Sequence, residues 1–311
     1  MRPPDRNRAS QIRQQLLRFD SEVLHLPGLS PADHIDCLVE QLVDSLRRVE
    51  YVFRVRDGNH DSRRTDPSSD LFDPLKAAVL HHRRGNVDEA FWLVFLATHF
   101  GKSAESNWRL VADVYGRLGG EEHWDWTTIS ACPGSFRDWL GANLHLLKGK
   151  GRRFSNHRKY QSLRAEAKNG LAAVVESYVA WISPPRTHQA LIRQIHERVG
   201  QNPKEVFEVL YQSMSAVRQF GRLGRFDYLT MLSKLGLAPI EAGSAYIGEG
   251  TGPLRGARLL FAGSAEDKRL DRELDDRALQ LESHLMVGMQ VIEDAICNWQ
   301  KSPHRFVSFN G

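Results

Sequence analysis

Residues 220–236 read FGRLGRFDYLTMLSKLG and lead from a glycine-containing turn into an amphipathic helix. Gly221 and Gly224 are three positions apart, and each is followed directly by an arginine, Arg222 or Arg225. The backbone N–H groups of a helix N-terminus, together with the helix dipole, bind anions, so this arrangement suits a phosphate. A corner between two helices with solvated charges explains the same residues, and the stretch alone leaves both interpretations open.

Helical periodicity extends through most of the chain. The run 86–102, NVDEAFWLVFLATHFGK, is the most apolar, and it predicts a buried core helix that ends at Gly101. Residues 32–55, which follow Pro31, predict another long helix. Further helices are predicted at 106–117, 134–147, 164–182, 187–199, 203–217, 226–236 and 266–301. Strand patterns are scarce and no internal repeat is visible, so the sequence predicts an all-α fold.

The predicted domain organisation is simple. Residues 1–10 are basic and are expected to form a flexible tail, and residues 11–311 are expected to form a single helical domain with room for two lobes. The hairpin stretch 220–236 and a long C-terminal helix, 266–301, belong to that domain.

Composition narrows the function classes. The chain has 311 residues, 41% hydrophobic and 26% charged, which is typical of a globular protein. A net charge of +4 and a pI near 9.0 favour a polyanionic partner. The three cysteines are far apart and no metal-ligand or cofactor-binding motif is present, so we expect no metal and no cofactor. We find neither a signal peptide nor an apolar run long enough for a bilayer, and we expect a cytoplasmic monomer.

The densest positive stretch is 148–159, KGKGRRFSNHRK. Basic residues interleaved with glycine, asparagine and an aromatic residue suit a loop that follows a phosphate backbone. The alternative is an ordinary solvated loop. The DNA-binding candidates of this stretch are Arg152, Arg153, Asn156, His157, Arg158 and Lys159.

The turn at 220–226 partly matches a helix–hairpin–helix motif. Such hairpins usually read hydrophobic–glycine–hydrophobic–glycine, and their amides hold a DNA phosphate. Here Arg222 occupies the first glycine position and Gly221 precedes it. We expect Gly221, Arg222, Gly224 and Arg225 to contact phosphate.

The C-terminal helix predicted at 266–301 carries an apolar stripe that faces the core. Asp294, Asn298 and Lys301 follow at helical spacing on one face beside that stripe, and Glu293 lies in a neighbouring row. A solvated surface explains such a row, and so does a polar site.

Several stretches together resemble a known family. EAFWLVFLATHFGK, FSNHRKYQSL, VVESYVAWI, TGPLRGARLLF and GMQVIEDAICNWQK resemble clade 3 of the alpha-glutamyl/putrescinyl thymine pyrophosphorylase family, over residues 35–301. The last two motifs are the most specific. The resemblance implies the fold of helix–hairpin–helix DNA glycosylases and a double-stranded DNA partner. It also implies a likeness to bacterial anti-phage glycosylases, which remove glucosylated hydroxymethylcytosine from phage DNA.

The same resemblance implies a catalytic aspartate about eighteen residues after the hairpin, but that count reaches Ser244. A carboxylate is needed because cleavage of an N-glycosidic bond builds positive charge on the sugar. Our catalytic candidates, in order, are Asp294, Glu241 and Glu293. The target base must leave the stack, and we expect Tyr246, Asn298 and Trp299 to line its pocket and Lys301 to contact DNA.

Bifunctional glycosylases of this class carry a nucleophilic lysine just after the hairpin, where this chain has Phe226. The sequence therefore favours a monofunctional glycosylase that uses water and leaves abasic sites. Two alternatives stay open. One is a transferase that replaces an activated hydroxymethyl group of a pyrimidine with putrescine or glutamate, and the other is a non-catalytic DNA-binding protein.

Overall fold

The computed structural model describes residues 3–149, 151–182 and 184–308. These residues form fourteen α-helices and no strand, which confirms the all-α class. The chain divides into two compact units: unit 1 is Met1–Tyr51 with Ala242–Asn310, and unit 2 is Val52–Glu241. Each unit is described separately.

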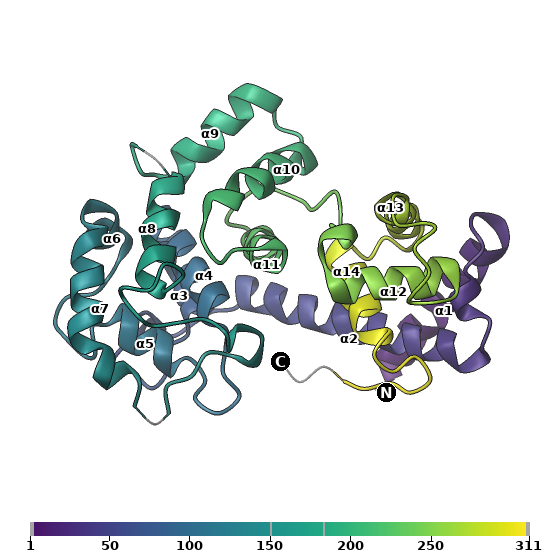
Figure 1. Cartoon of the computed structure of the whole chain (residues 1–311), viewed down its shortest axis with the longest axis horizontal. Helices are drawn as coiled ribbons and strands as arrows, with labels where there is room; N and C mark the ends of the chain where they lie inside the picture. Colours follow the sequence, from purple (N-terminus) through teal and green to yellow (C-terminus); the bar gives the residue numbers. More distant parts are fainter. Residues whose placement is uncertain (1–2, 150, 183, 309–311) are drawn as a thin grey trace. The chain divides into compact units, whose positions relative to one another are not determined.

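Unit 1 is built from both ends of the chain (Figure 1). Its elements are α1 (Pro3–Glu22), η1 (Pro27–Leu29), most of α2 (Ala32–Asp57), η5 (Ile247–Glu249), α12 (Thr251–Ala262), α13 (Leu274–Leu285) and α14 (Met289–Trp299). Apolar residues at helical spacing, such as Ile12, Leu16 and Phe19 on α1, are buried and form one core with the apolar faces of α2, α12, α13 and α14.

Two glycines let α12 approach α14 very closely. A Cβ atom added at Gly256 would lie 2.3 Å from the carbonyl oxygen of Ile296, and one at Gly252 would lie 2.6 Å from Sγ of Cys297. The two helices also lie side by side in Figure 1. The sequence motifs 251–261 and 288–301 are therefore two faces of one helix–helix contact, which requires glycine on α12.

Two sequence predictions about unit 1 are wrong. Residues 3–10 are not a flexible tail, because they form the first turns of α1, where Arg8 pairs with Glu50 at 2.5 Å. The single C-terminal helix predicted at 266–301 is two helices, α13 and α14. The break falls at Met286 and Gly288, both with positive φ (53° and 91°), so the backbone leaves the α-helical region there.

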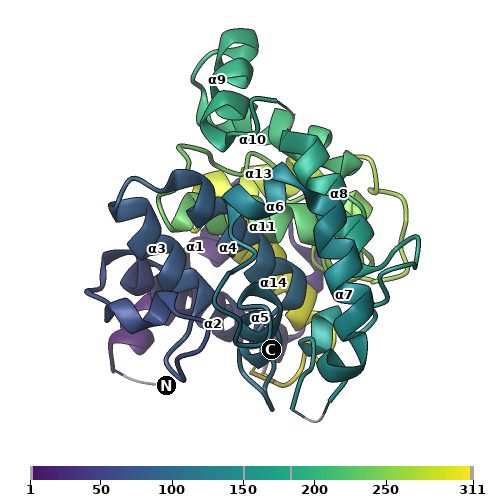
Figure 2. The ribbon, with the colours of Figure 1, turned by 90° about the vertical axis from the view of Figure 1, so that its left-hand side faces the viewer.

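Unit 2 contains the remaining elements. They are η2 (Ser62–Thr65), α3 (Pro74–Arg83), α4 (Val87–Phe100), α5 (Arg109–Tyr115), α6 (Trp126–Ala131), α7 (Pro133–Leu147), η3 (Asn156–Arg158), α8 (Leu171–Ile182), α9 (His188–Val199), α10 (Pro203–Ser213), η4 (Met214–Ala216) and α11 (Arg222–Lys234). The neighbouring helices α7 and α8 pack against each other, as Figures 1 and 2 show.

The apolar run at 86–102 forms the central helix of unit 2, as the sequence predicts. Ten of the fourteen residues of α4 are buried, and α3, α9 and α11 pack around it. Asn86 precedes the helix, and Gly101, with φ of 64°, ends it. Within the described residues no helix is both long enough and apolar enough to cross a membrane.

Candidate functional site

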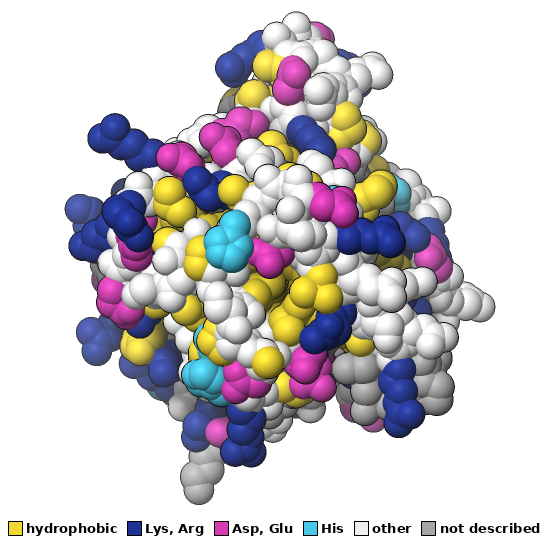
Figure 3. All heavy atoms as spheres, turned by 90° about the vertical axis from the view of Figure 1, so that its right-hand side faces the viewer, with side chains coloured by type: hydrophobic (Ala, Val, Ile, Leu, Met, Phe, Trp, Pro, Cys, Tyr) yellow, Lys and Arg dark blue, Asp and Glu magenta, His cyan; other side chains and the backbone are white. Residues whose placement is uncertain are grey.

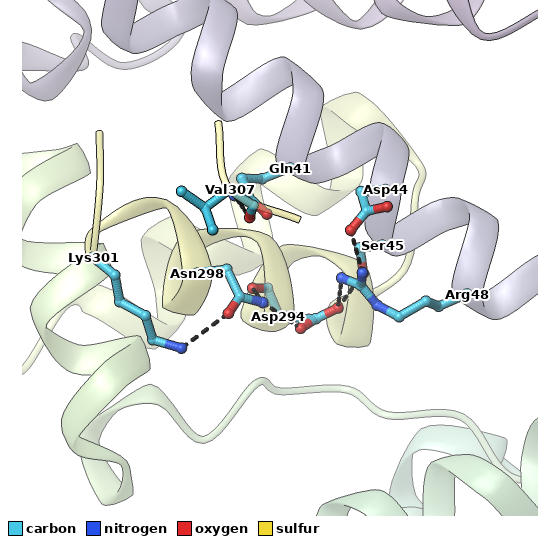
Figure 4. A network of polar contacts seen from close by, with 8 residues as sticks. All are labelled: Gln41, Asp44, Ser45, Arg48, Asp294, Asn298, Lys301 and Val307. Carbon is cyan, nitrogen blue, oxygen red and sulfur yellow. Dashed lines mark hydrogen bonds and ion pairs between the residues drawn. The ribbon is translucent and has the colours of Figure 1, made fainter. Parts of the chain in front are cut away.

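The polar row predicted on the C-terminal helix belongs to a hydrogen-bonded network in unit 1 (Figure 4). Oδ2 of Asp294 accepts hydrogen bonds from Oγ of Ser45 at 2.7 Å and from Nη2 of Arg48 at 2.6 Å. Ser45 and Arg48 are three positions apart, so both project from one face of α2 toward α14. The carboxylate of Asp294 is thereby fixed by two donors from a second helix, and its side chain is 27% exposed.

The network continues along α14 through Asn298. Its Nδ2 donates to Oδ1 of Asp294 at 2.9 Å, and its Oδ1 accepts from Nζ of Lys301 at 2.9 Å. The spacing of Asp294, Asn298 and Lys301 therefore brings the three side chains together, as their helical positions require. Asn298 is 9% exposed and Lys301 is exposed, so the row runs from the interior to the surface.

Arg48 holds two carboxylates at this site. Its guanidinium also contacts Oδ2 of Asp44 on the preceding turn of α2. Burial acts to lower the pKa of Arg48, but the charges and hydrogen bonds of Asp294 and Asp44 outweigh burial and raise it. The site thus combines a permanently charged guanidinium with a partly exposed carboxylate, which can orient a water molecule or stabilise positive charge.

The other predicted site residues of unit 1 are more deeply buried. Glu293 is 7% exposed. Trp299 is fully buried, and its Nε1 donates to the carbonyl oxygen of His34 at 3.1 Å, so its ring is part of the core. Tyr246 is 7% exposed and has a left-handed backbone conformation, with φ of 48°.

Glu241 belongs to unit 2 rather than unit 1. Its side chain is 63% exposed and pairs with Nζ of Lys204 at 3.4 Å. A solvated carboxylate of this kind has no fixed orientation beyond one surface ion pair.

Ser244, the position reached by counting from the hairpin, contacts an aspartate from another helix. Its Oγ donates to Oδ1 of Asp275 at 2.8 Å, and the amide of Ile247 donates to the same oxygen at 3.0 Å. Asp275, in the first turn of α13, therefore places a carboxylate beside the position that the count from the hairpin reaches. Sequence counting missed this residue because it lies 31 positions from Ser244 along the chain.

The predicted hairpin joins α10 to α11 within unit 2. Gly221 precedes α11, and a Cβ atom added there would meet nothing within 4 Å, so the backbone at this position is open. Gly224 packs against the ring of Phe220, 3.2 Å from the position of an added Cβ atom. The turn therefore leads directly into the N-terminus of α11. Gly221 is accessible there, whereas Gly224 is needed for packing against Phe220.

The two hairpin arginines are each only 9% exposed. The guanidinium of Arg225 lies over the ring of Tyr211 at 4.1 Å, and its Nη1 donates to the Tyr211 carbonyl oxygen at 3.1 Å. That of Arg222 lies over the ring of Phe226 at 5.3 Å. This burial gives both side chains a packing role that the sequence did not predict.

The basic stretch 148–159 is not uniformly exposed. Arg152 binds Asp113 at 2.7 Å and Arg158 binds Asp227 at 3.0 Å, and both arginines are largely buried. Lys150 lies outside the described residues. The exposed candidates are Arg153, Asn156, His157 and Lys159.

Tyr160 directly follows these residues and is 86% exposed, with Nζ of Lys159 at 5.1 Å from its ring centre. Sequence reasoning did not single it out, although an aromatic residue after a basic run is a typical stacking platform.

Figure 3 shows the distribution of charge on one face of the molecule. Basic and acidic side chains are interspersed there, and this face has no continuous basic patch.

A family model for alpha-glutamyl/putrescinyl thymine pyrophosphorylase clade 3 matches residues 33–311. The chain belongs to this family, which confirms the resemblance seen in the sequence and links the protein to DNA modification. No curated protein and no solved structure matches the chain significantly.

Proposed function

We propose that the protein is a monofunctional DNA glycosylase, which excises hypermodified pyrimidines such as glucosylated hydroxymethylcytosine from phage DNA. The observation that carries the proposal is the Asp294 carboxylate, held by Ser45 and Arg48 and bonded to Asn298 on a partly exposed face. Membership of a thymine pyrophosphorylase family supports a modified pyrimidine as the target.

In this mechanism Asp294 stabilises the positive charge that develops on the sugar as the N-glycosidic bond breaks, and it orients the attacking water. Ser45 and Arg48 keep the carboxylate in place. The Asn298 amide is close enough to Asp294 to help read an extruded base, and Lys301 can hold a neighbouring phosphate. Host DNA lacks bulky base adducts, so a pocket that requires the adduct would spare the host.

The nucleophile should be water. Phe226 stands where a bifunctional enzyme has its lysine, and it is fully buried. The next lysine on α11 is Lys234, eight residues further, or about 12 Å along the helix axis. Borohydride should therefore trap no covalent adduct, and nicks should appear only after alkali or an abasic-site endonuclease.

We propose two DNA contacts in unit 2. The first is the exposed set Arg153, Asn156, His157 and Lys159, with Tyr160 as a stacking surface. The second is the N-terminus of α11, where the open backbone at Gly221 would approach a phosphate. Arg222 and Arg225 follow in the first turn of this helix and would add positive charge.

The family's name favours a second candidate function. A pyrophosphorylase would displace pyrophosphate from an activated hydroxymethylpyrimidine with an amine such as putrescine or glutamate, and the base would stay attached to the DNA. A non-catalytic DNA-binding role is the third candidate, since Ser244 replaces the expected aspartate.

Mass spectrometry of the products distinguishes the three. The protein is incubated with T-even-type phage DNA, with unmodified DNA and, in the presence of putrescine or glutamate, with DNA that carries an activated (pyrophosphorylated) hydroxymethylpyrimidine. A glycosylase releases the modified base from the phage DNA only. A transferase releases pyrophosphate from activated DNA and frees no base, and a binding protein leaves both DNAs intact.

A further inference from the structure

Unit 2 contains a pocket of about 420 Å³ beside α8, a volume within the usual range for small-molecule sites. Ala173, Ser177 and Ala180 line it at spacings of four and three residues along one face of α8. Ala216, in η4, adds another small side chain to the lining. Because none of these side chains is large, the space beside this face of α8 is left unfilled.

Three larger side chains also line this pocket, which we call the Trp181 pocket. Trp181 supplies an aromatic ring, Glu176 a carboxylate and Arg218 a guanidinium. The indole N–H of Trp181 donates to Oγ of Ser213 at 3.0 Å. The backbone amide of Arg218 donates to Oγ of Ser177 at 2.9 Å. These two hydrogen bonds fix the aromatic ring and the backbone of the segment that carries Arg218.

Both charged groups keep hydrogen-bonding capacity for a ligand. The Glu176 carboxylate pairs with Arg137 through Oε1 at 2.7 Å and Oε2 at 2.5 Å, and its side chain is 33% exposed. A carboxylate has about four lone-pair positions, so acceptor positions remain. A guanidinium has several N–H donors, and within the part of the chain that the structure describes Arg218 uses one, from Nη1 to the carbonyl oxygen of Lys168 at 3.2 Å.

An unpaired nucleotide presents the groups that complement this pocket. Its base has a flat face that stacks on aromatic side chains, and its phosphate binds a guanidinium. An exocyclic amine, such as N4 of cytosine, donates to a carboxylate, whereas thymine has the O4 acceptor at the same position. A base inside the double helix is already stacked and paired, so only an unpaired nucleotide can use the carboxylate, the ring and the guanidinium together.

We propose that the Trp181 pocket binds one unpaired nucleotide of a DNA strand, with a base that carries an exocyclic amine and with cytosine as the expected base. Arg218 lies three positions before Gly221, which precedes α11, so a strand whose phosphate is held at α11 can continue into the pocket. This site rests on the DNA-binding role proposed above. It binds a nucleotide and does not cleave it, since no residue of the pocket belongs to the Asp294 network.

The test compares three unmodified duplexes of one sequence: a fully paired duplex, one with a single bulged deoxycytidine and one with a bulged thymidine at the same position. Fluorescence anisotropy with the full-length protein gives their dissociation constants. Wild type should bind the deoxycytidine bulge about tenfold or more tighter than the paired duplex, because the unpaired base stacks on an aromatic side chain. It should bind the thymidine bulge about fivefold less tightly than the deoxycytidine bulge, because O4 cannot donate to Glu176.

Variants assign these preferences to the pocket. Trp181→Ala should remove the preference for a bulge and leave binding to the paired duplex unchanged, whereas Trp181→Phe keeps an aromatic ring and should retain most of the preference. Glu176→Gln should bind both bulges equally, because an amide can also donate to O4 of thymine. Trp139→Ala is the matched control, since Trp139 is also a half-buried tryptophan of unit 2 and does not line the pocket. Thermal melts show which variants are folded.

Titration of the wild type with dCMP and dTMP tests the pocket without any variant, and dCMP should bind more tightly. Equal binding of the two mononucleotides, or an unchanged bulge preference in folded Trp181→Ala, would overturn the proposal. None of these measurements depends on base release. Bulge binding through Trp181 without base release from phage DNA would support the pocket and contradict the glycosylase, and base release without any bulge preference would do the reverse.

Discussion

Each unit contains a hydrogen-bonded chain that starts at an aspartate, and the two chains differ in where they lead. In unit 1 Asp294 bonds to Ser45, Arg48 and Asn298. In unit 2 Asp88 bonds to Nδ1 of His188 at 2.7 Å, whose Nε2 accepts from the Tyr178 hydroxyl at 2.7 Å. The aspartate side chains are almost equally exposed, 27% for Asp294 and 28% for Asp88, so exposure of the acid does not separate the two chains.

The other residues of the two hydrogen-bonded chains do differ in exposure. The unit 1 chain ends at the exposed amine of Lys301, whereas the unit 2 chain continues inward to Tyr178 and Tyr228, both fully buried. Burial raises the pKa of both tyrosines and lowers the pKa of His188, so these three groups stay neutral. Both aspartates are partly exposed, but beyond Asp88 every member of the second chain is buried, whereas the first chain ends at an exposed group. The second resembles a proton relay, but its place inside the core indicates that it holds α4, α8, α9 and α11 together.

The largest expected effect comes from Asp294→Asn. The amide keeps the shape and can still accept from Ser45 and Arg48, but it cannot stabilise developing positive charge. Base release from phage DNA should fall by about 10²–10³-fold or more, while DNA affinity is retained. Single-turnover assays and binding titrations measure the two quantities separately.

Asp276→Asn, an exposed change on α13, is the matched control and should have wild-type activity. Glu293→Gln and Glu241→Gln test the other two candidates. A fully active Asp294→Asn protein would contradict the role proposed for Asp294, and full activity of all three amide variants would exclude every candidate carboxylate.

In unit 2 the expected effect is on stability. Tyr178→Phe removes the hydroxyl that donates to His188 and contacts Tyr228 at 2.7 Å, and both groups lose a partner inside the core. Unfolding in urea should show a loss of roughly 1–3 kcal/mol. Tyr51→Phe, an exposed change, should cost nothing measurable. A Tyr178→Phe protein with normal stability and lost base release would reverse the roles of the two chains.

A second buried histidine of unit 2 makes stability depend on pH. His99 is 2% exposed and packs against Phe95 and Phe220, and its Nε2 has no hydrogen-bond partner among the described residues. Burial, helped by the charge of Arg158, lowers its pKa from 6.5 to about 3. Between about pH 6.5 and 3 the His99 ring is therefore protonated in the unfolded chain but stays neutral in the folded protein. The free energy of unfolding falls as the pH drops through this range.

His99→Phe should remove this loss, because phenylalanine fills a similar space and does not titrate. Each pH unit below about 6.5 is worth up to about 1.4 kcal/mol for one such group. Burial also raises the pKa of Glu89 to about 7, and this group acts in the opposite direction: its stability contribution is lost as the pH rises from 4.5 to 7. The comparison must therefore be between wild type and His99→Phe at each pH, with the exposed His145→Phe as control. Parallel stability curves for wild type and His99→Phe would contradict the burial argument.

The sequence predicted those features that depend on neighbours along the chain. The all-α class followed from periodicity, and the row Asp294, Asn298 and Lys301 followed from helical spacing. The helix break at Met286 was missed because a left-handed methionine leaves no signal of the kind that glycine alone would give. The helical start of the chain was missed because residues 3–10 are polar and include two prolines, and the buried apolar residues of α1 begin only at Ile12.

Contacts between distant segments could not be predicted. Ser45 and Arg48 lie about 250 residues before Asp294, and Ser177 lies 41 residues before Arg218, whose amide it binds. The acidic partners of the basic stretch, Asp113 and Asp227, were equally invisible. The density of basic residues in the sequence does not distinguish an arginine that pairs with a buried aspartate from an exposed arginine that can bind DNA.

The smallest expected effects test that last distinction with two adjacent residues, Arg152 and Arg153. Arg153 is 65% exposed and pairs with Glu105 at 3.3 Å, an exposed contact worth little in stability. If it holds a phosphate, Arg153→Ala should weaken binding to all duplexes alike and lower the salt slope of binding by about one unit, with an unchanged melting temperature.

Arg152 instead shares the largely buried Asp113 with Arg109, at 2.7 and 2.8 Å. Arg152→Ala should therefore lower stability by roughly 1–3 kcal/mol and leave the salt slope of the folded protein near that of wild type. Salt titrations of duplex binding, with thermal melts on the same samples, separate the two outcomes. Equal salt slopes in wild type and Arg153→Ala would indicate that the basic stretch 148–159 is an ordinary solvated loop.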